Sequence, residues 1–128
     1  MSYFFSKVLT ISYEEAITRV TETLKTEGFG ILTEIDVKAV LKKKLNVDFR
    51  PYKILGACNP NLAILALNAE DRIGLLLPCN VIVQQTADGN VEVAAIDPLF
   101  QLKGIDNPKL LDVAGEVHEK MKRVIDRL

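Results

Sequence analysis

The chain has 128 residues, of which 48% are hydrophobic and 26% are charged, and its formal net charge is −1. This composition is typical of one globular domain, here residues 1–128, and it excludes general disorder. No apolar run is long enough to span a membrane and no leader peptide is recognisable, so we expect a cytoplasmic protein without membrane contact. Because the charges balance, a dedicated nucleic-acid binder is not expected.

Strands and helices alternate in the first half of the chain. Ser12 and Glu15 form a capping box, which starts a helix that Gly28 ends. Asp36 is a suitable N-cap for a second helix. The predicted elements are a strand over residues 3–11, a helix over 13–27, a strand over 29–35, a helix over 37–45 and a strand over 52–58.

The second half begins with Asn59-Pro60, a helix N-cap followed by proline at the first helical position. Asp88-Gly89 is the strongest hairpin signal in the chain, because a type I′ turn needs positive φ at both central residues. Pro78 interrupts the strand before this turn, and residues 98–103 read as a short turn. The predicted elements are a helix over 61–68, strands over 75–87 and 90–96, and a helix from 108 to about 127.

The predicted element order is β-α-β-α-β-α-β-β-α. The closing hairpin requires an antiparallel pair, which excludes a purely parallel sheet. We therefore expect a two-layer α+β domain whose helices lie mainly on one face of the sheet. The other face must be polar or covered, and a homodimer would cover it.

Two cysteines stand in similar settings, Ala-Cys-Asn-Pro and Pro-Cys-Asn. Cys58 directly precedes a helix N-terminus, where free amides and the helix dipole stabilise a thiolate. Both Cys58 and Cys79 can also be buried core residues, and in the cytosol both should be reduced. With one histidine and no Cys-x-x-Cys pair, no metal site and no cofactor is predicted.

Further polar side chains could take part in a site. Asn59 serves either as a helix cap or as a ligand contact, and Asn80 lies in a strand, where asparagine is disfavoured. Glu34 and Asp36 could share a proton or a ligand, although Asp36 is also explained as a cap. His118 is expected to be a partly buried structural residue, because no acid or nucleophile can be placed beside it.

A cluster of basic residues lies between the second and third predicted strands. It is opposed there only by Asp48, so it forms either a solvated helix face or an anion-binding surface. Its members are Lys38, Lys42, Lys43, Lys44, Arg50 and Lys53.

Two longer strings carry a resemblance: FGILTEIDVKAVLKKKLNVDFRPYKILGACNPNLAILAL over residues 29–67 and IGLLLPCNVIVQ over residues 73–84. They resemble the prokaryotic family called domain of unknown function 302 (DUF302), and the resemblance extends over the whole chain. It implies a compact α+β domain with a curved antiparallel sheet, similar in outline to that of the TATA-binding protein, and a tendency to form dimers. It implies no activity. The residues at its motif positions are Glu34, Asp36, Lys38, Tyr52, Lys53, Cys58, Asn59, Pro60, Pro78, Cys79 and Asn80.

Three functional hypotheses follow. The first is a homodimeric module that binds or senses a small ligand in a cleft near Cys58, Asn59, Cys79 and Asn80. The second is a thiol-dependent redox protein or enzyme that uses Cys58 with Cys79, although no motif is specific enough to predict catalysis. The third is polyanion binding through residues 38–50. The candidate ligand-binding residues are Glu34, Asp36, Tyr52, Lys53, Asn59 and Asn80.

Overall fold

Within residues 2–128, which the computed structural model describes, the chain forms five strands and six helical segments. The strands are β1 (Phe4–Leu9), β2 (Gly30–Asp36), β3 (Tyr52–Cys58), β4 (Cys79–Gln85) and β5 (Val91–Ile96). The helices are α1 (Tyr13–Thr26), α2 (Val37–Leu45), α3 (Pro60–Ala69), the 3₁₀-helix η1 (Asp71–Leu76), α4 (Pro98–Leu102) and α5 (Pro108–Asp126). None of the helices in this part of the chain is long and apolar enough to cross a bilayer.

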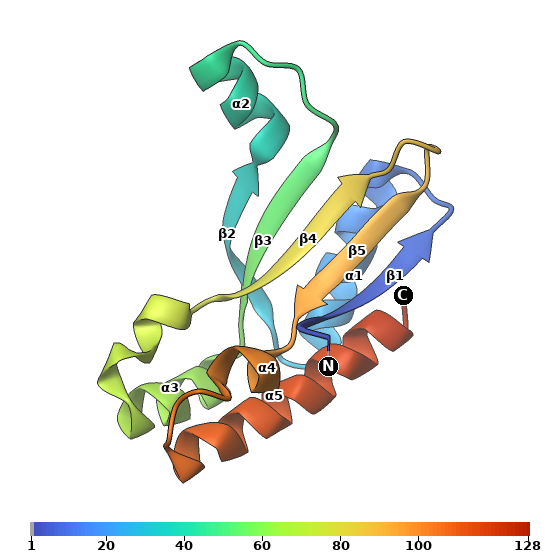
Figure 1. Ribbon diagram of the computed structural model, residues 1–128. Coiled ribbons are helices and arrows are strands. Elements are labelled where there is room, and N and C mark those ends of the chain that lie inside the picture. The colour runs from blue at the N-terminus through green and yellow to red at the C-terminus, as the bar shows by residue number, and fades with distance from the viewer. Residues whose placement is uncertain (1) are drawn as a thin grey trace.

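The strands form one sheet in the order β1-β5-β4-β3-β2, and every neighbouring pair is antiparallel (Figure 1). The first strand therefore lies at one edge of the sheet, beside the last strand of the sequence. This arrangement confirms the predicted α+β class, the antiparallel sheet and the order of the elements.

The two faces of the sheet differ. Side chains alternate along β4 and β5, so that Val81, Val83, Val91 and Val93 are fully buried. These residues face α1 and α5, which pack against the sheet, while no helix of residues 2–128 lies across the opposite face (Figure 1). The prediction that the helices lie mainly on one face is confirmed.

The apolar interior has two parts. The main core fills the space between the sheet and the helices α1 and α5. A smaller core joins α3, η1 and α4 to the first half of α5. Helix α5 belongs to both, since Leu110 and Ala114 lie in the smaller core while Met121 and Val124 lie in the main one. One continuous helix thus ties the two parts together.

Two predictions about local structure were wrong. The strand predicted over 75–87 begins only at Cys79, because residues 71–76 form η1, whose start is capped by the Glu70 carboxylate. Residues 98–102 form α4 and not a turn, because the Asp97 carboxylate accepts a hydrogen bond from the Leu99 amide. Asp97-Pro98 carries the same cap-and-proline signal that starts α3 and α5.

Helix α2 stands apart from the other helices at the end of the β2–β3 pair (Figure 1). None of its nine residues, all of which the structure describes, is buried. It packs chiefly against β2 and β3, the strands that it connects. The predicted helix over 37–45 is therefore confirmed, but its apolar side chains lack the cover that such a face normally finds within a domain.

Candidate functional site

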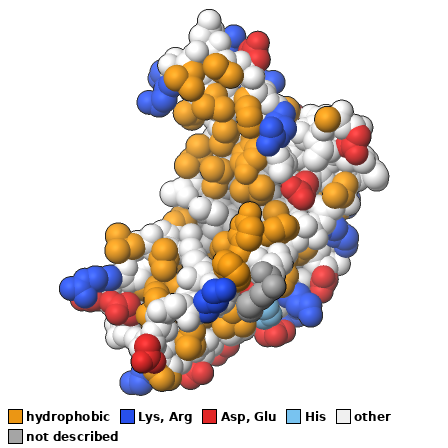
Figure 2. All heavy atoms as spheres, in the orientation of Figure 1, with side chains coloured by type: hydrophobic (Ala, Val, Ile, Leu, Met, Phe, Trp, Pro, Cys, Tyr) orange, Lys and Arg blue, Asp and Glu red, His pale blue; other side chains and the backbone are white. Residues whose placement is uncertain are grey.

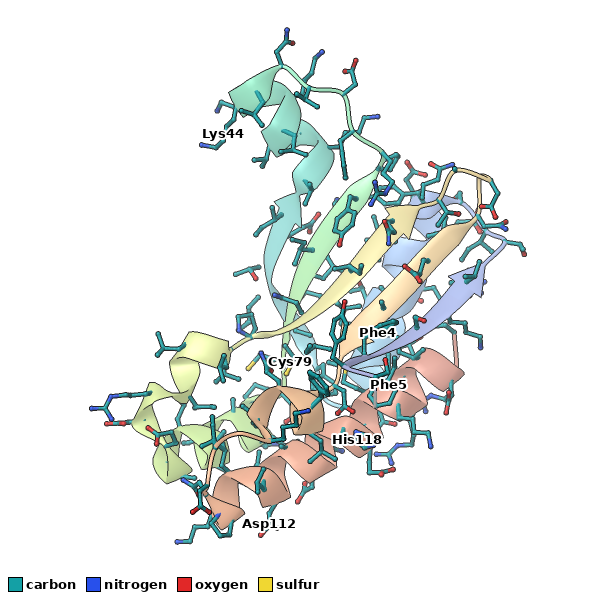
Figure 3. The ribbon with its side chains drawn as sticks, in the orientation of Figure 1. Phe4, Phe5, Lys44, Cys79, Asp112 and His118 are labelled. Atoms are coloured by element: carbon teal, nitrogen blue, oxygen red, sulfur yellow. The ribbon has the colours of Figure 1, made fainter. Side chains whose placement is uncertain are left out.

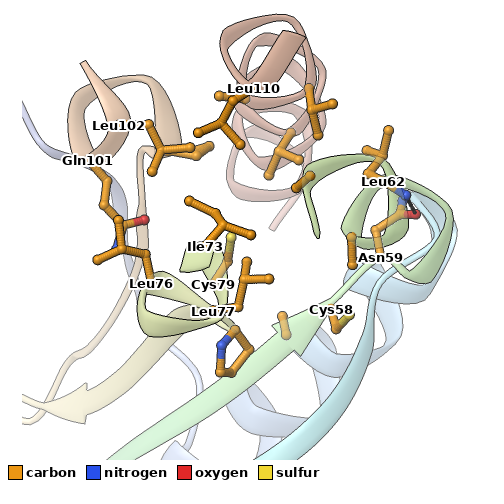
Figure 4. Close-up of a pocket in the computed structure, with 18 of the residues that line it drawn as sticks. Cys58, Asn59, Leu62, Ile73, Leu76, Leu77, Cys79, Gln101, Leu102 and Leu110 are labelled. Carbon is orange, nitrogen blue, oxygen red and sulfur yellow. Dashed lines mark hydrogen bonds between the residues drawn. The ribbon is translucent and has the colours of Figure 1, made fainter. Parts of the chain in front are cut away.

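A cavity of about 50 Å³ lies where the two cores meet (Figure 4). Its walls come from the ends of β3 and β4 and from the helices α3, η1, α4 and α5. Leu62, Ile73, Leu77, Leu110 and Ala114 are among the apolar side chains that line it, and apart from two thiols its polar side chains are those of Asn59 and Gln101. Such a chamber can hold an apolar group far more readily than a charged one.

Three of the four residues predicted to form a cleft line this cavity: Cys58, Asn59 and Cys79. The fourth, Asn80, is exposed on the opposite face of the sheet. Successive residues of a strand point to opposite faces, so Asn80 lies on the face of the sheet opposite to that of its neighbour Cys79. The structure thus brings the two thiols and Asn59 together and separates Asn80 from them.

Asn59 joins the start of α3 to the end of α1. Its side-chain oxygen accepts a hydrogen bond from the Leu62 amide (3.3 Å), which caps α3, and its Nδ2 donates to the Glu27 carbonyl at the end of α1 (3.1 Å). Next to this contact, Gly28 adopts φ +85°, and a Cβ on it would lie 2.9 Å from Asn59 Nδ2. The predicted caps at both positions are confirmed, and the amide of Asn59 is engaged within the chain.

The two thiols reach the cavity from adjacent strands. In the β3–β4 pair, Cys79 lies opposite Ala57, which directly precedes Cys58 in β3. Neither cysteine forms a disulfide. Cys79 is 9% exposed and Cys58 more so. Burial, and secondarily the nearby Cys58, raises the pKa of the Cys79 thiol to about 11. Cys79 therefore remains a neutral thiol at physiological pH.

This difference predicts selective alkylation of the native protein. A pKa of about 11 in place of the ordinary 9.0 reduces the thiolate fraction of Cys79 at neutral pH about one hundredfold, and burial limits access further. We expect iodoacetamide to modify Cys58 at least a hundredfold faster than Cys79, as measured by mass spectrometry of tryptic peptides. In urea the two rates should become equal, and equal rates in the native protein would contradict the burial of Cys79.

The other candidate residues lie away from the cavity. Lys53 and Glu34 form an ion pair of 2.6 Å across β3 and β2, and the Asp36 carboxylate accepts a hydrogen bond from the Ala39 amide to cap α2. Tyr13 lies close to these acids, and burial, followed by the charges of Asp36, Glu14 and Glu34, raises its pKa to about 12. These side chains thus have partners on the surface around β2.

A hydrogen-bonded contact between Asp97 and His118 was not predicted. Asp97 is 4% exposed, and its Oδ1 lies 2.7 Å from Nδ1 of His118. The Phe5 ring packs edge-on against the imidazole, with the ring centres 5.1 Å apart (Figure 3). The expectation that no acid lies beside His118 was wrong, because α5 passes the end of β5 and brings residues from two distant segments together. The adjacent Pro98 and Val117 line the cavity, so this pair fixes one of its walls.

The open face of the sheet carries a second hollow, of about 370 Å³, which we call the open-face groove. Arg50 Nε donates to Gln84 Oε1 and Gln84 Nε2 donates to Glu92 Oε1, both at 2.8 Å, so a polar ladder crosses one end of it. Figure 2 shows hydrophobic side chains gathered on this face, from α2 down over the sheet. The residues that line the groove are Tyr3, Phe4, Tyr52, Asn80, Ile82, Gln84, Glu92, Ala94, Ala95 and Ile96.

The fold and the cavity define a class: an antiparallel α+β domain with one open sheet face and an apolar chamber at the end of the sheet. The chain belongs to the family described as "Domain of unknown function DUF302", whose model matches residues 5–128. It is similar to an uncharacterised conserved DUF302 protein from Bacillus stearothermophilus, known from a crystal structure, with 30% identity and a TM-score of 0.91 over 99% of this chain and 98% of that one. A search of curated proteins found no match.

Proposed function

We propose that the protein is a small-ligand-binding module and that its ligand is a small apolar molecule, or the apolar end of a larger one, held in the cavity between the two cores. The observation that carries this proposal is a chamber whose walls come from six separate elements and are lined mainly by apolar side chains. Asn59 and the Asp97–His118 pair hold these elements in fixed positions.

An imperfection in packing is the competing explanation, and a cavity-filling variant distinguishes the two. Ala114 is buried and lines the cavity, and Ala114→Val adds two methyl groups there. Ala94→Val is the matched control, because Ala94 lies on the open face of the sheet. Suitable probes must fit a cavity of about 50 Å³, so we choose xenon and the short carboxylates propionate and butyrate, whose binding is followed by thermal melting and by methyl NMR spectra.

We expect at least one probe to stabilise the native protein, by about 2.7 kcal/mol at a concentration of one hundred times its Kd. Ala114→Val should abolish this stabilisation and Ala94→Val should retain it. The proposal fails if no probe shifts the melting temperature or the spectra, or if Ala114→Val binds the probes as well as the control.

The module is, in this proposal, a homodimer. The sheet leaves one face uncovered, and large apolar side chains on it and on its edges are well exposed, for example Phe4 (37%), Val8 (57%) and Leu32 (67%). Contiguous exposed apolar surface of this kind is typical of an interface between subunits. Sedimentation velocity tests the dimer, for which we expect a mass of twice the 14.2 kDa of the chain.

Two other functions receive less support. The raised pKa of Cys79 works against thiol exchange at neutral pH, where a resolving thiol must be able to ionise. In the basic cluster, Lys42 forms an ion pair with Asp48 and Lys53 with Glu34, so two of its six cations have a carboxylate partner within the chain, and the net charge of −1 does not favour a polyanion. A ligand-binding role in the reducing cytoplasm therefore remains the function that we propose.

A further inference from the structure

We propose that α2 of each protomer docks in the open-face groove of a second copy of the chain, so that the two protomers exchange their α2 helices. This inference rests on the homodimer proposed above and specifies which surfaces form it. Both surfaces lie on the same chain, and a twofold axis lets each protomer give one helix and receive one.

Helix α2 supplies an apolar surface without a cover. Val40 is 38% exposed, Leu45 66%, and Val47, just beyond the helix, 46%. A nine-residue helix is marginal in water on its own and normally depends on packing of its apolar side. Figure 3 places Lys44 at the far end of α2, well away from α1, α3 and α5. Nothing within residues 2–128 covers this end of the helix.

The open-face groove has a complementary shape and chemistry. Its floor is the middle of the sheet, with Ile82, Ala94 and Ile96, and aromatic side chains of Tyr52 and Phe4 line it as well. It is an open hollow and not a closed chamber, so it can admit a helix face (Figure 2). An amphipathic helix laid in an apolar groove is a recurring mode of recognition.

The charges favour α2 over a second sheet as the occupant. Helix α2 contains four lysines and no acidic residue, whereas Glu92 is the one charged side chain among the described residues that line the groove. In a groove-on-groove contact, neither copy of Glu92 would meet a cation among the residues that line the groove. Packing α2 in the groove instead brings lysines to Glu92, and opposite charges across an interface select the partner and its register.

Both proposed surfaces belong to a set of large apolar side chains that are 37–67% exposed on the sheet's open face, its edges and the α2 segment. They are Tyr3, Phe4, Val8, Leu32, Ile35, Val40, Leu45 and Val47.

Sedimentation velocity of three full-length proteins tests the docking: the unaltered chain, Leu45→Asp and Leu75→Asp. Both leucines are strongly exposed, at 66% and 85%, so neither change should disturb the monomer fold, and circular dichroism melts check this. Leu75 lies on η1, outside α2 and the groove. We expect Leu45→Asp to weaken dimerisation by roughly thirtyfold or more, as for loss of a central interface residue, and Leu75→Asp to leave it unchanged.

A mixing experiment tests the exchange itself. Ala94→Arg blocks the groove and leaves α2 intact. Leu45→Asp disrupts the apolar surface of α2 and leaves the groove intact. Each variant alone should be monomeric, but an equimolar mixture can form a heterodimer with one intact α2–groove contact. We expect the mixture to sediment faster than either variant alone.

The outcomes separate this inference from the homodimer. If the unaltered chain is dimeric and Leu45→Asp remains equally dimeric, or the mixture shows no heterodimer, α2 exchange is wrong and the homodimer stands. If the unaltered chain is monomeric at the highest concentration tested, both are wrong. Ligand binding in the cavity is measured independently by the Ala114→Val experiment.

Discussion

We expect Gly56→Ala to lower the free energy of unfolding by about 3 kcal/mol, at the upper end of the usual cost of overpacking a core. Gly56 is buried in the middle of β3, between β2 and β4. A Cβ at this position would lie 2.6 Å from Pro78 Cγ and closer still to Thr33 Oγ1. Neither neighbour is the free end of a flexible side chain, so strands must shift to admit the methyl group.

Urea unfolding measures this effect, and Gly30→Ala is the matched control. Gly30 lies in the adjacent strand β2, where an added Cβ meets no atom within 4 Å. This control should be neutral or slightly stabilising, because alanine restricts the unfolded chain. Thr33→Ala in the Gly56→Ala background should restore part of the loss, because it removes one of the two clashing groups. Equal destabilisation by Gly56→Ala and Gly30→Ala would contradict the close approach.

The second large effect is expected at His118. His118→Ala leaves the Asp97 carboxylate buried without the partner that lies 2.7 Å away, and we expect it to cost about 3 kcal/mol of unfolding free energy. Loss of the imidazole also removes the edge contact with Phe5. Because Pro98 and Val117 line the cavity, this variant should also weaken binding of any probe held there.

A double-mutant cycle with His118→Ala and Asp97→Ala measures the pair itself. The double variant should lose less than the sum of the two single losses, since removing both partners leaves neither side with an unsatisfied hydrogen-bonding group. Glu119→Gln is the control: Glu119 is 64% exposed and 3.9 Å from the other imidazole nitrogen, and exposed pairs at such distances contribute at most about 1 kcal/mol. Strict additivity in the cycle would show that Asp97 and His118 do not depend on each other.

The sequence was most informative where a local signal sufficed. The capping box at Ser12, the Asn59-Pro60 pair and the Asp88-Gly89 turn each correspond to an element boundary in the structure. The same type of signal at Asp97-Pro98 was available and would have predicted α4. The type I′ turn predicted at Asp88-Gly89 is wrong, however, because φ is positive at Gly89 but not at Asp88, and the hairpin closes over a longer loop in which the Thr86 amide donates to the Asn90 carbonyl. Residues 75–78 were predicted to begin a strand, but Leu75 and Leu76 belong to η1, whose first turn is capped by the Glu70 carboxylate. Periodicity alone does not decide such short runs.

Contacts between distant segments were the part that the sequence could not supply. Cys58, Asn59 and Cys79 were grouped because the sequences around the two cysteines are similar, whereas the adjacency of their strands and the position of Asn80 on the opposite face are known only from the structure. The Asp97–His118 pair depends on the path of α5 across the end of β5, which no spacing in the sequence expresses. The cavity likewise depends on how two cores meet.

The place of β1 in the sheet has a consequence for synthesis on the ribosome. Phe4 pairs with Ile96 and Leu9 with Val91, so β1 is translated long before the strand that it joins. Strands β2 to β5 are neighbours both in sequence and in the sheet and can pair as they emerge, whereas β1 must wait with its apolar side chains uncovered. Closure of the β1–β5 contact is therefore the late event of folding, and the waiting segment is where a nascent-chain chaperone would bind.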